Sequence, residues 1–241
     1  MKAVVIAGGE GRRLGQATAI TPKPLMEFEG TPLLHIILRQ LRSAGFSEVT
    51  LSLRHRADLI KASCAAVNWG SLELDFIVES QRMGTAGPLK LLPPLQEATL
   101  VMNADLLTSL DFTDVMSHHS RSGADSTIVI TPHDTELAHG VVRIDDNSRV
   151  VSFEEKPRIH HLINCGIYVV EPTVLDCLPG QTPCDMPVLL ENLRTAGGVV
   201  GGYIFEGEWR DIGTPQQLEE ARIAFRENHD TFLPESELVQ G

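Results

Sequence analysis

The sequence contains no long hydrophobic run. Apolar residues nowhere continue for the eighteen or so positions that a membrane-spanning helix requires. The opening residues, MKAVVIAGG, lack the apolar segment and small-residue cleavage site of a secretory signal peptide. The four cysteines are scattered and form no C-x-x-C pair, which argues against a zinc knuckle or a disulfide framework. We therefore expect a cytoplasmic protein with no membrane partner.

The sequence also has few basic residues relative to acidic ones. Lysine and arginine total 20 against 32 aspartates and glutamates, which gives a formal net charge of −12. No basic stripe runs along any segment, which argues against DNA, RNA or an anionic membrane as the main partner. An acidic protein that binds phosphates therefore needs local cations, supplied by a few arginines and lysines or by a metal ion.

The first half of the chain alternates short apolar runs with segments of helical periodicity, which predicts a mainly parallel sheet with helices on both faces. The predicted strands are residues 2–7, 49–53, 72–79, 98–107 and 125–132, and the predicted helices are 31–46, 56–67 and 111–123. Thr31 is expected to cap the first helix, with Pro32 at its first position. The segment 83–92 is expected to be a loop followed by a helix.

The second half begins with a different pattern. Residues 140–157 alternate and turn at Asp146-Asn147, which predicts a hairpin. The following segments are a strand at 162–171, a helix at 185–197, a strand at 198–207 and a helix at 214–225. We expect one α/β domain over residues 1–228 and a flexible C-terminal tail over 229–241. The two adjacent histidine pairs, 118–119 and 160–161, are expected at the surface.

A glycine-rich loop with basic residues follows the first strand, in AGGEGRRLGQATAITPKPL. This layout is typical of a loop whose backbone amides bind phosphates. The Walker form is absent because no G-K-[ST] follows. The dinucleotide form lacks its third glycine, and LRHR replaces the acidic residue after the second strand. An NADP-linked oxidoreductase, with Arg54 and Arg56 on the 2′-phosphate, stays open as an alternative.

A series of ordered motifs carries a family resemblance. These motifs are AGGEGRRL with TPKPL, MGTAGPL, NAD after a buried strand, HGVV, FEEKP, NCGIYV and WRDIGTP, and they extend to about residue 225. The chain resembles the sugar-1-phosphate nucleotidylyltransferases, in particular the mannose-1-phosphate guanylyltransferase-like branch. The resemblance implies a three-layer, Rossmann-like nucleotide-diphospho-sugar transferase fold. It also implies Mg²⁺ as cofactor, and the reaction of an NTP with a sugar 1-phosphate to give an NDP-sugar and pyrophosphate.

The resemblance also assigns the site residues. The expected catalytic residues are Arg13, Lys23, Asp105 and Asp211, of which Asp105 and Asp211 are also the expected metal ligands. The expected nucleotide-binding residues are Ala7, Gly8, Gly9, Gly11, Glu79, Gly84 and Thr85. The expected sugar-phosphate-binding residues are Gly140, Glu154, Lys156 and Asn164. Arg12 is expected to face solvent.

The choice of substrates rests on fewer residues. A carboxylate at Glu79 can accept hydrogen bonds from N1–H and the 2-amino group of guanine, a donor pair that uracil and thymine lack. GTP is therefore favoured, with a mannose-, heptose- or glucosamine-type sugar 1-phosphate. The alternatives are an enzyme using UTP or dTTP, a cytidylyltransferase acting on a non-sugar phosphate, and a non-catalytic regulator that binds an NDP-sugar. A homodimer is compatible with the sequence.

Overall fold

A computed structural model describes residues 1–15, 21–180 and 183–233, and its centre is a seven-stranded sheet. Its strands are β1 (Lys2–Ile6), β4 (Glu48–Leu53), β5 (Glu73–Val78), β6 (Thr99–Asn103), β8 (Ser126–Glu136), β11 (Arg158–Val170) and β12 (Val200–Ile204). Their order is β12-β8-β11-β6-β1-β4-β5. Strands β6, β1, β4 and β5 are parallel, whereas β11 runs antiparallel to both β6 and β8. The expected mainly parallel, mixed sheet is confirmed.

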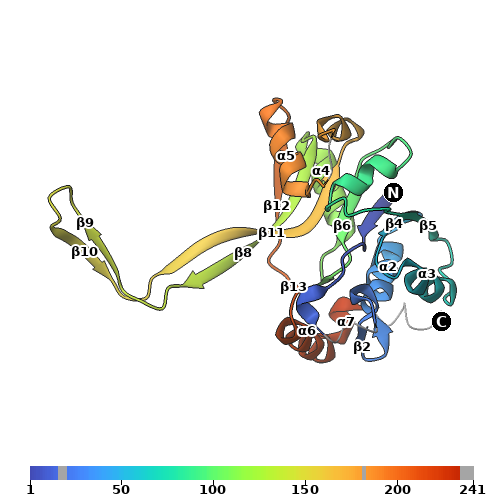
Figure 1. Cartoon of the computed structure of the whole chain (residues 1–241), viewed down its shortest axis with the longest axis horizontal. Coiled ribbons are helices and arrows are strands. Elements are labelled where there is room, and N and C mark those ends of the chain that lie inside the picture. Colours follow the sequence, from blue (N-terminus) through green and yellow to red (C-terminus); the bar gives the residue numbers. More distant parts are fainter. Residues whose placement is uncertain (16–20, 181–182, 234–241) are drawn as a thin grey trace.

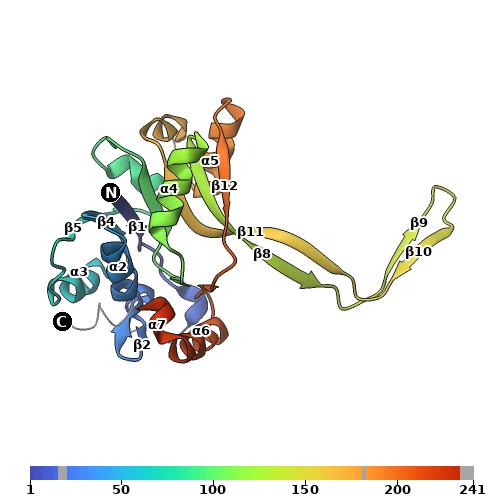
Figure 2. The same ribbon diagram turned by 180° about the vertical axis from the view of Figure 1, so that it is seen from behind.

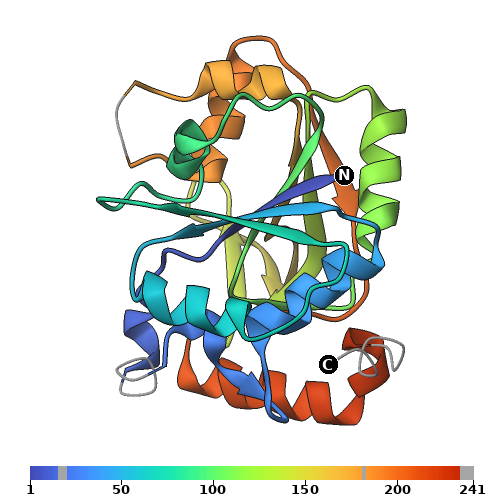
Figure 3. The same ribbon diagram turned by 90° about the vertical axis from the view of Figure 1, so that its right-hand side faces the viewer.

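Helices cover both faces of this sheet (Figure 3). On β1, Ala3 and Val5 belong to one buried cluster and Val4 to the other, so the strand is apolar throughout because both its faces are covered. The first cluster includes side chains of α2 (Leu33–Ser43), α3 (Ala57–Ala65), α4 (Phe112–Ser122), α6 (Pro215–Glu227) and α7 (His229–Phe232). The second includes side chains of α5 (Met186–Thr195), η3 (Gly87–Leu91) and η4 (Pro172–Cys177).

Two strands of the sheet continue beyond it as an arm, which we define as residues 131–163 (Figures 1 and 2). Strands β8 and β11 stay paired as far as Glu136 and Arg158. A second hairpin of β9 (Val141–Ile144) and β10 (Val150–Glu154) extends the arm. It turns at the expected place, because Ser148 N–H donates to the Asp145 carbonyl at 3.0 Å.

Several shorter strands and 3-10 turns connect the longer elements. These are η1 (Arg12–Leu14), η2 (Lys23–Leu25), β2 (Glu27–Phe28), β3 (Thr31–Pro32), β7 (Leu106–Thr108) and β13 (Trp209–Asp211). Strand β13 pairs antiparallel with β7, and β2 pairs with β3. None of the helices in the described ranges is long and apolar enough to cross a membrane.

Several local predictions are wrong. Helix α2 begins at Leu33, because Thr31 and Pro32 pair with β2 as strand β3. The helix expected after MGTAGP is the 3-10 turn η3. The tail expected to be flexible from residue 229 starts with α7, since Phe232 packs into the core with 0% exposure. Residues 234–241 lie outside the described residues. His119 is buried and bonds Thr127 Oγ1 at 2.8 Å, whereas His118, His160 and His161 are not buried.

Candidate functional site

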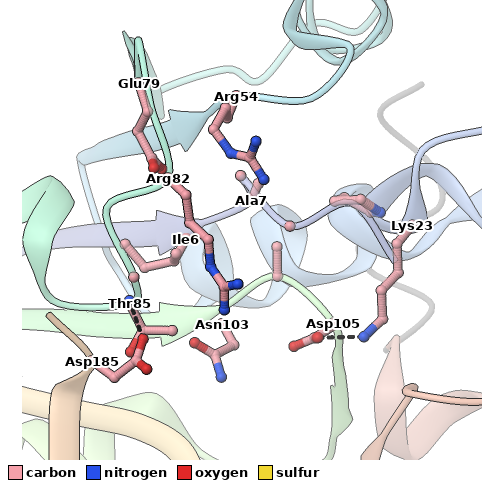
Figure 4. A pocket seen from close by; sticks show the side chains of 15 residues that line it. Ile6, Ala7, Lys23, Arg54, Glu79, Arg82, Thr85, Asn103, Asp105 and Asp185 are labelled. Carbon is pink, nitrogen blue, oxygen red and sulfur yellow. Dashed lines mark hydrogen bonds and ion pairs between the residues drawn. The ribbon is translucent and has the colours of Figure 1, made fainter. Parts of the chain in front are cut away.

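A pocket lies at the carboxyl ends of the four parallel strands (Figure 4). β1 is followed by Ala7, β4 by Arg54, β5 by Glu79 and β6 by Ala104, and all four residues line it. Ligands of open α/β sheets bind at this edge, because several loops converge there. The lining residues are Ile6, Ala7, Gly8, Gly9, Lys23, Pro24, Arg54, Glu79, Arg82, Gly84, Thr85, Asn103, Ala104, Asp105 and Asp185.

The glycine loop forms one wall of the pocket. The Ala7 N–H donates to the Ser52 carbonyl at 2.8 Å, which ties the loop to β4. A Cβ added at Gly8 would lie 2.6 Å from Oε1 of Glu79, so the close approach of loop and carboxylate requires glycine. Gly11 does not line the pocket. It has a left-handed backbone conformation, with φ 64°, and directly precedes η1, which contains Arg13. Arg12 faces solvent as expected, ion-paired with Glu10.

Glu79 is a buried carboxylate with fixed orientation. It is 5% exposed, and its Oε1 accepts a 2.8 Å hydrogen bond from the Ser52 hydroxyl. Its Oε2 accepts from the Met83 N–H at 3.3 Å. An ionised carboxylate can accept about four hydrogen bonds, so these two bonds do not use up its acceptor capacity.

The loop after β5 forms the next wall, and it is held by the start of α5. Gly84 has φ +81, and a Cβ there would overlap the Cys184 carbonyl. The Thr85 N–H donates to Oδ1 of Asp185 at 3.0 Å, and the Thr85 hydroxyl accepts from the Met186 N–H at 2.8 Å. Gly84 and Thr85 therefore line the pocket because of contacts with a segment far along the chain.

Charged side chains gather on the side of the pocket at the end of β6. Lys23 is 8% exposed and forms an ion pair with the Asp105 carboxylate. Asp211 is close by, because it lies opposite Leu106 in the β13–β7 ladder and the Ile212 N–H donates to the Asp105 carbonyl at 3.0 Å. The two aspartates, distant in sequence, are thus adjacent in the fold.

The pKa of Asp211 is raised above its ordinary value of 3.8. Burial is the main cause, the charge of Asp105 adds to it, and Lys23 and Arg13 act in the opposite direction. A Cβ added at Gly213 would lie 3.2 Å from Nη2 of Arg13 and 3.3 Å from Oδ2 of Asp211, so both side chains surround the same glycine. All four expected catalytic residues therefore lie in one electrostatically coupled group.

This group fits a magnesium ion that also contacts a substrate. Within residues 1–15, 21–180 and 183–233, no group of three His, Cys, Asp or Glu side chains is placed to hold a metal. Mg²⁺ uses one or two protein carboxylates together with substrate phosphates. Asp105 and Asp211 are two adjacent carboxylates of this kind, and a divalent cation between them would offset both the burial of Asp211 and its repulsion from Asp105.

The structure does not bring the expected sugar-phosphate residues to this pocket. Gly140, Glu154 and Lys156 lie on the arm, because β8 and β11 keep pairing past the edge of the sheet and carry the hairpin away. Asn164 lies at the root of the arm, where its side chain donates to the Tyr168 hydroxyl at 2.6 Å and accepts from the Gly166 N–H. None of these four residues lines the pocket, and their expected role in binding the sugar phosphate stays a prediction.

Several residues that line the pocket were not expected there from the sequence. Arg54 was considered only for a 2′-phosphate, and Arg82, Asn103 and Asp185 were not singled out. Arg82, in the loop after β5, and Asn103, the last residue of β6, both point into the pocket (Figure 4). Asn103 is the first residue of the NAD motif and Arg82 directly precedes MGTAGPL, so the position of each in the sequence was a usable signal. Asp185 carried no signal beyond its place before a helix.

Comparison with known proteins gives consistent matches. Residues 2–228 match the family model described as "Nucleotidyl transferase". Mannose-1-phosphate guanyltransferase of Aspergillus oryzae is 32% identical over 227 residues, which cover 90% of this chain and 62% of that protein. The mannose-1-phosphate guanylyltransferase catalytic subunit beta of Drosophila melanogaster is 34% identical, over 90% of this chain and 60% of that protein. The chain thus spans about 60% of the length of these relatives.

Solved structures share the fold. HddC from Yersinia pseudotuberculosis superposes with a TM-score of 0.71 at 27% identity, over 93% of this chain and 99% of that chain. The same protein has been solved in complex with GMP-PN. A putative glucose-1-phosphate thymidylyltransferase from Bacillus anthracis gives a TM-score of 0.72 at 20% identity, which is a likeness of fold. These neighbours agree with the Rossmann-like architecture described above.

Proposed function

Because the chain belongs to the nucleotidyl transferase family, we propose that it transfers a nucleoside monophosphate from an NTP to a sugar 1-phosphate and releases pyrophosphate. The named relatives that act on mannose 1-phosphate support this reaction, as does the grouping of phosphate-binding residues at one edge of the sheet. The single observation that carries the proposal is the set of Arg13, Lys23, Asp105 and Asp211 beside the glycine loop.

The chemistry requires binding more than proton transfer. The second pKa of a phosphate monoester is near ~6, so the attacking oxygen is already anionic at neutral pH. In the proposed reaction Arg13 and Lys23 neutralise charge on the NTP phosphates, and the backbone amides of the glycine loop donate to them. Holding the two substrates in line can remove roughly 7–11 kcal/mol of the barrier.

Asp105 and Asp211 are the residues that would hold Mg²⁺. When bound, the ion would neutralise the phosphate charge that grows as pyrophosphate leaves. Lys23 pairs with Asp105 and compensates part of the charge of that carboxylate. The two carboxylates would orient the ion, and the glycine loop and the two basic side chains would orient the triphosphate.

Glu79 favours GTP as the nucleotide. Its carboxylate is buried, fixed by Ser52 and Met83, and keeps acceptor capacity beyond these two bonds. Guanine presents two adjacent donors, N1–H and the 2-amino group, which match such a carboxylate. The GMP-PN complex of HddC and the guanyltransferase relatives support the same choice.

A matrix assay tests the proposal. Five NTPs are combined with mannose, heptose and glucosamine 1-phosphates and Mg²⁺, and pyrophosphate release is measured, with EDTA as the metal-free control. We expect product with GTP and at least one of these sugars, and none with EDTA. Product with UTP or dTTP alone would overturn the base assignment. Tight binding of an NDP-sugar without pyrophosphate would indicate a regulator.

A further inference from the structure

The arm presents an uncovered apolar face. In the β9–β10 ladder Phe153 pairs with Val142 and Val150 with Ile144, so these four side chains lie on one face. Phe153 is 78% exposed. The opposite face is more polar, since Ser152 pairs with Arg143 and Glu154 with Val141. A two-stranded hairpin with one apolar face is marginally stable in water unless something packs on it.

Exposed large hydrophobic residues concentrate on the arm. Eight of the fifteen in the described part of the chain lie there: Leu137, Val142, Ile144, Val150, Val151, Phe153, Ile159 and Leu162. Both outer edges of the arm are also unpaired along β9 and β10, which form a sheet of two strands only. Such a segment is suited to pack against another protein surface.

A groove of about 460 Å³ lies where the arm leaves the body. It is lined by His133 and Ile163 of the arm and by Trp209, Asp211 and Glu220 of the body, among others. The groove adjoins the pocket, because Asp211 lines the groove and the N–H of the next residue, Ile212, donates to the carbonyl of the pocket residue Asp105 at 3.0 Å.

This groove needs positive charge to receive a second anionic substrate. Arg210 is the arginine among its lining residues, and it is ion-paired with Glu208 at 3.1 Å. Asp211 and Glu220 give the groove an acidic lining. Lys156 and Arg158 are basic residues on the arm, exposed to solvent and distant from the groove of their own chain.

We propose that two copies of this chain exchange arms, so that the hairpin of each copy covers the groove of the other. Lys156 of the partner subunit then binds the phosphate of the sugar 1-phosphate, and Glu154 of the partner subunit accepts hydrogen bonds from its hydroxyls. The inference rests on the proposed function for the identity of this ligand. A reciprocal exchange satisfies the two-fold symmetry of a closed dimer.

Strand pairing favours a second copy over the chain's own arm. Five consecutive pairs, from Leu162↔Pro132 to Arg158↔Glu136, hold the arm in its extended direction. Folding the hairpin back onto its own groove would disrupt this ladder. Docking on another copy keeps every pair and also covers the apolar face of β9 and β10.

Subunit complementation tests the exchange. One variant, Lys23→Met, has a damaged pocket and an intact arm; the other, Glu154→Ala with Lys156→Ala, has the reverse. The two variants are mixed one to one, mildly unfolded and refolded. Half of the dimers would then be hybrids, each with one site that combines an intact pocket with an intact arm. We therefore expect activity to recover to about a quarter of the wild-type level. The matched control mixes Lys23→Met with Asp105→Asn, both damaged in the pocket, and should show no recovery.

Sedimentation velocity gives a readout that does not depend on activity. We expect the wild-type chain to sediment as a dimer and the variant Val142→Ser with Phe153→Ser to sediment as a monomer. The control Val188→Ser, at a 50% exposed position on α5, should stay dimeric. A monomeric wild-type chain, a dimer unaffected by the arm variant, or an active dimer without complementation would overturn the exchange. An inactive wild-type dimer that the arm variant dissociates would overturn the proposed function alone.

Discussion

Strands β8 and β11 run through both the body and the arm, where their surroundings differ. The comparison shows that strand pairing can stay the same while the burial of the side chains depends on what packs beside the strands. Inside the body they lie between β12 and β6, and Val129 and Val169 are 0% exposed. In the arm the same ladder continues with no third strand beside it, and Leu162 is 58% exposed. Pairing is the same in both regions, whereas burial changes completely.

The same contrast divides the candidate site. The residues expected to bind the nucleotide lie in one pocket, where contacts within the chain fix Glu79, Thr85 and Lys23. The residues expected on the sugar side, Gly140, Glu154 and Lys156, lie on the exposed arm. The first set is therefore preorganised by the body, whereas in the proposed exchange the second set is positioned only when the arm docks on the partner subunit.

The largest expected effect compares a buried and an exposed phenylalanine. Phe112 is 1% exposed and packs edge-on against Phe46, so Phe112→Ala should lower the free energy of unfolding by about 3–5 kcal/mol. Phe153→Ala should change it by less than about 0.5 kcal/mol when measured at dilutions that keep the chain monomeric. Urea unfolding measures both. Equal losses would mean that the arm packs onto its own body in solution.

Lys23→Met should have the next largest effect, and on activity. Because the proposed reaction uses Lys23 to neutralise the triphosphate, its removal should lower kcat by about 100- to 1,000-fold. Steady-state pyrophosphate release measures this effect, with circular dichroism to verify folding. The control is Lys61→Met, which loses only a cation placed over the Phe76 ring at 5.8 Å and should keep normal activity. A folded Lys23→Met variant with wild-type kcat would remove this residue from the mechanism.

Glu79→Gln should have a smaller, base-specific effect. The amide keeps an acceptor for Ser52 but presents a donor toward guanine, so kcat/KM for GTP should fall about 10- to 100-fold. Activity with UTP should fall much less, and the ratio of the two is the measurement. Glu73→Gln, on an exposed position of β5, is the matched control. An unchanged GTP-to-UTP ratio would contradict guanine recognition by Glu79.

Asp211→Asn should have the smallest effect, a small increase in the free energy of unfolding at neutral pH without Mg²⁺. The pKa of the Asp211 carboxyl is raised in the folded chain, so its ionised form costs stability above that pKa. This cost is relieved as pH falls through the raised pKa. Without Mg²⁺ the variant should therefore be more stable than the wild type at neutral pH, and the difference should shrink on acidification.

Thermal unfolding in EDTA across this pH range measures the difference. Asp146→Asn, in the exposed turn of the arm, is the control and should not change the pH dependence. Adding Mg²⁺ should stabilise the wild type and not Asp211→Asn, because the ion competes with protons for this carboxylate. A variant less stable than the wild type at neutral pH without metal would contradict the assigned cause of the raised pKa.

The sequence predicted the body of the molecule better than its arm, for a physical reason. Buried strands such as β1 and the glycine loop after it leave local signals, namely continuous apolar runs and glycine spacing. The hairpin of β9 and β10 was also predicted, since its turn is local. Its direction was not, because an alternating strand does not specify which surface its apolar face will meet.

Other features that the sequence did not predict also depend on contacts between distant parts of the chain. Asp185 joins the pocket only because α5 begins beside the loop of Gly84 and Thr85, a tertiary contact across the chain. Phe232 was assigned to a loose tail because the polar sequence around it hides one buried ring. Pro32 is typical of a first helical position, yet pairing with Glu27 places it in β3.

The pairing of β13 with β7 has a consequence for how the protein is made. Asp105 precedes its neighbour Asp211 by a long stretch of sequence. A nascent chain that has completed β1, β4 and β6 already carries the glycine loop, but it lacks Asp211 and the start of α5, which holds Gly84 and Thr85 in the pocket. The two aspartates can therefore meet only after β13 has been translated, when most of the central sheet has already been synthesised.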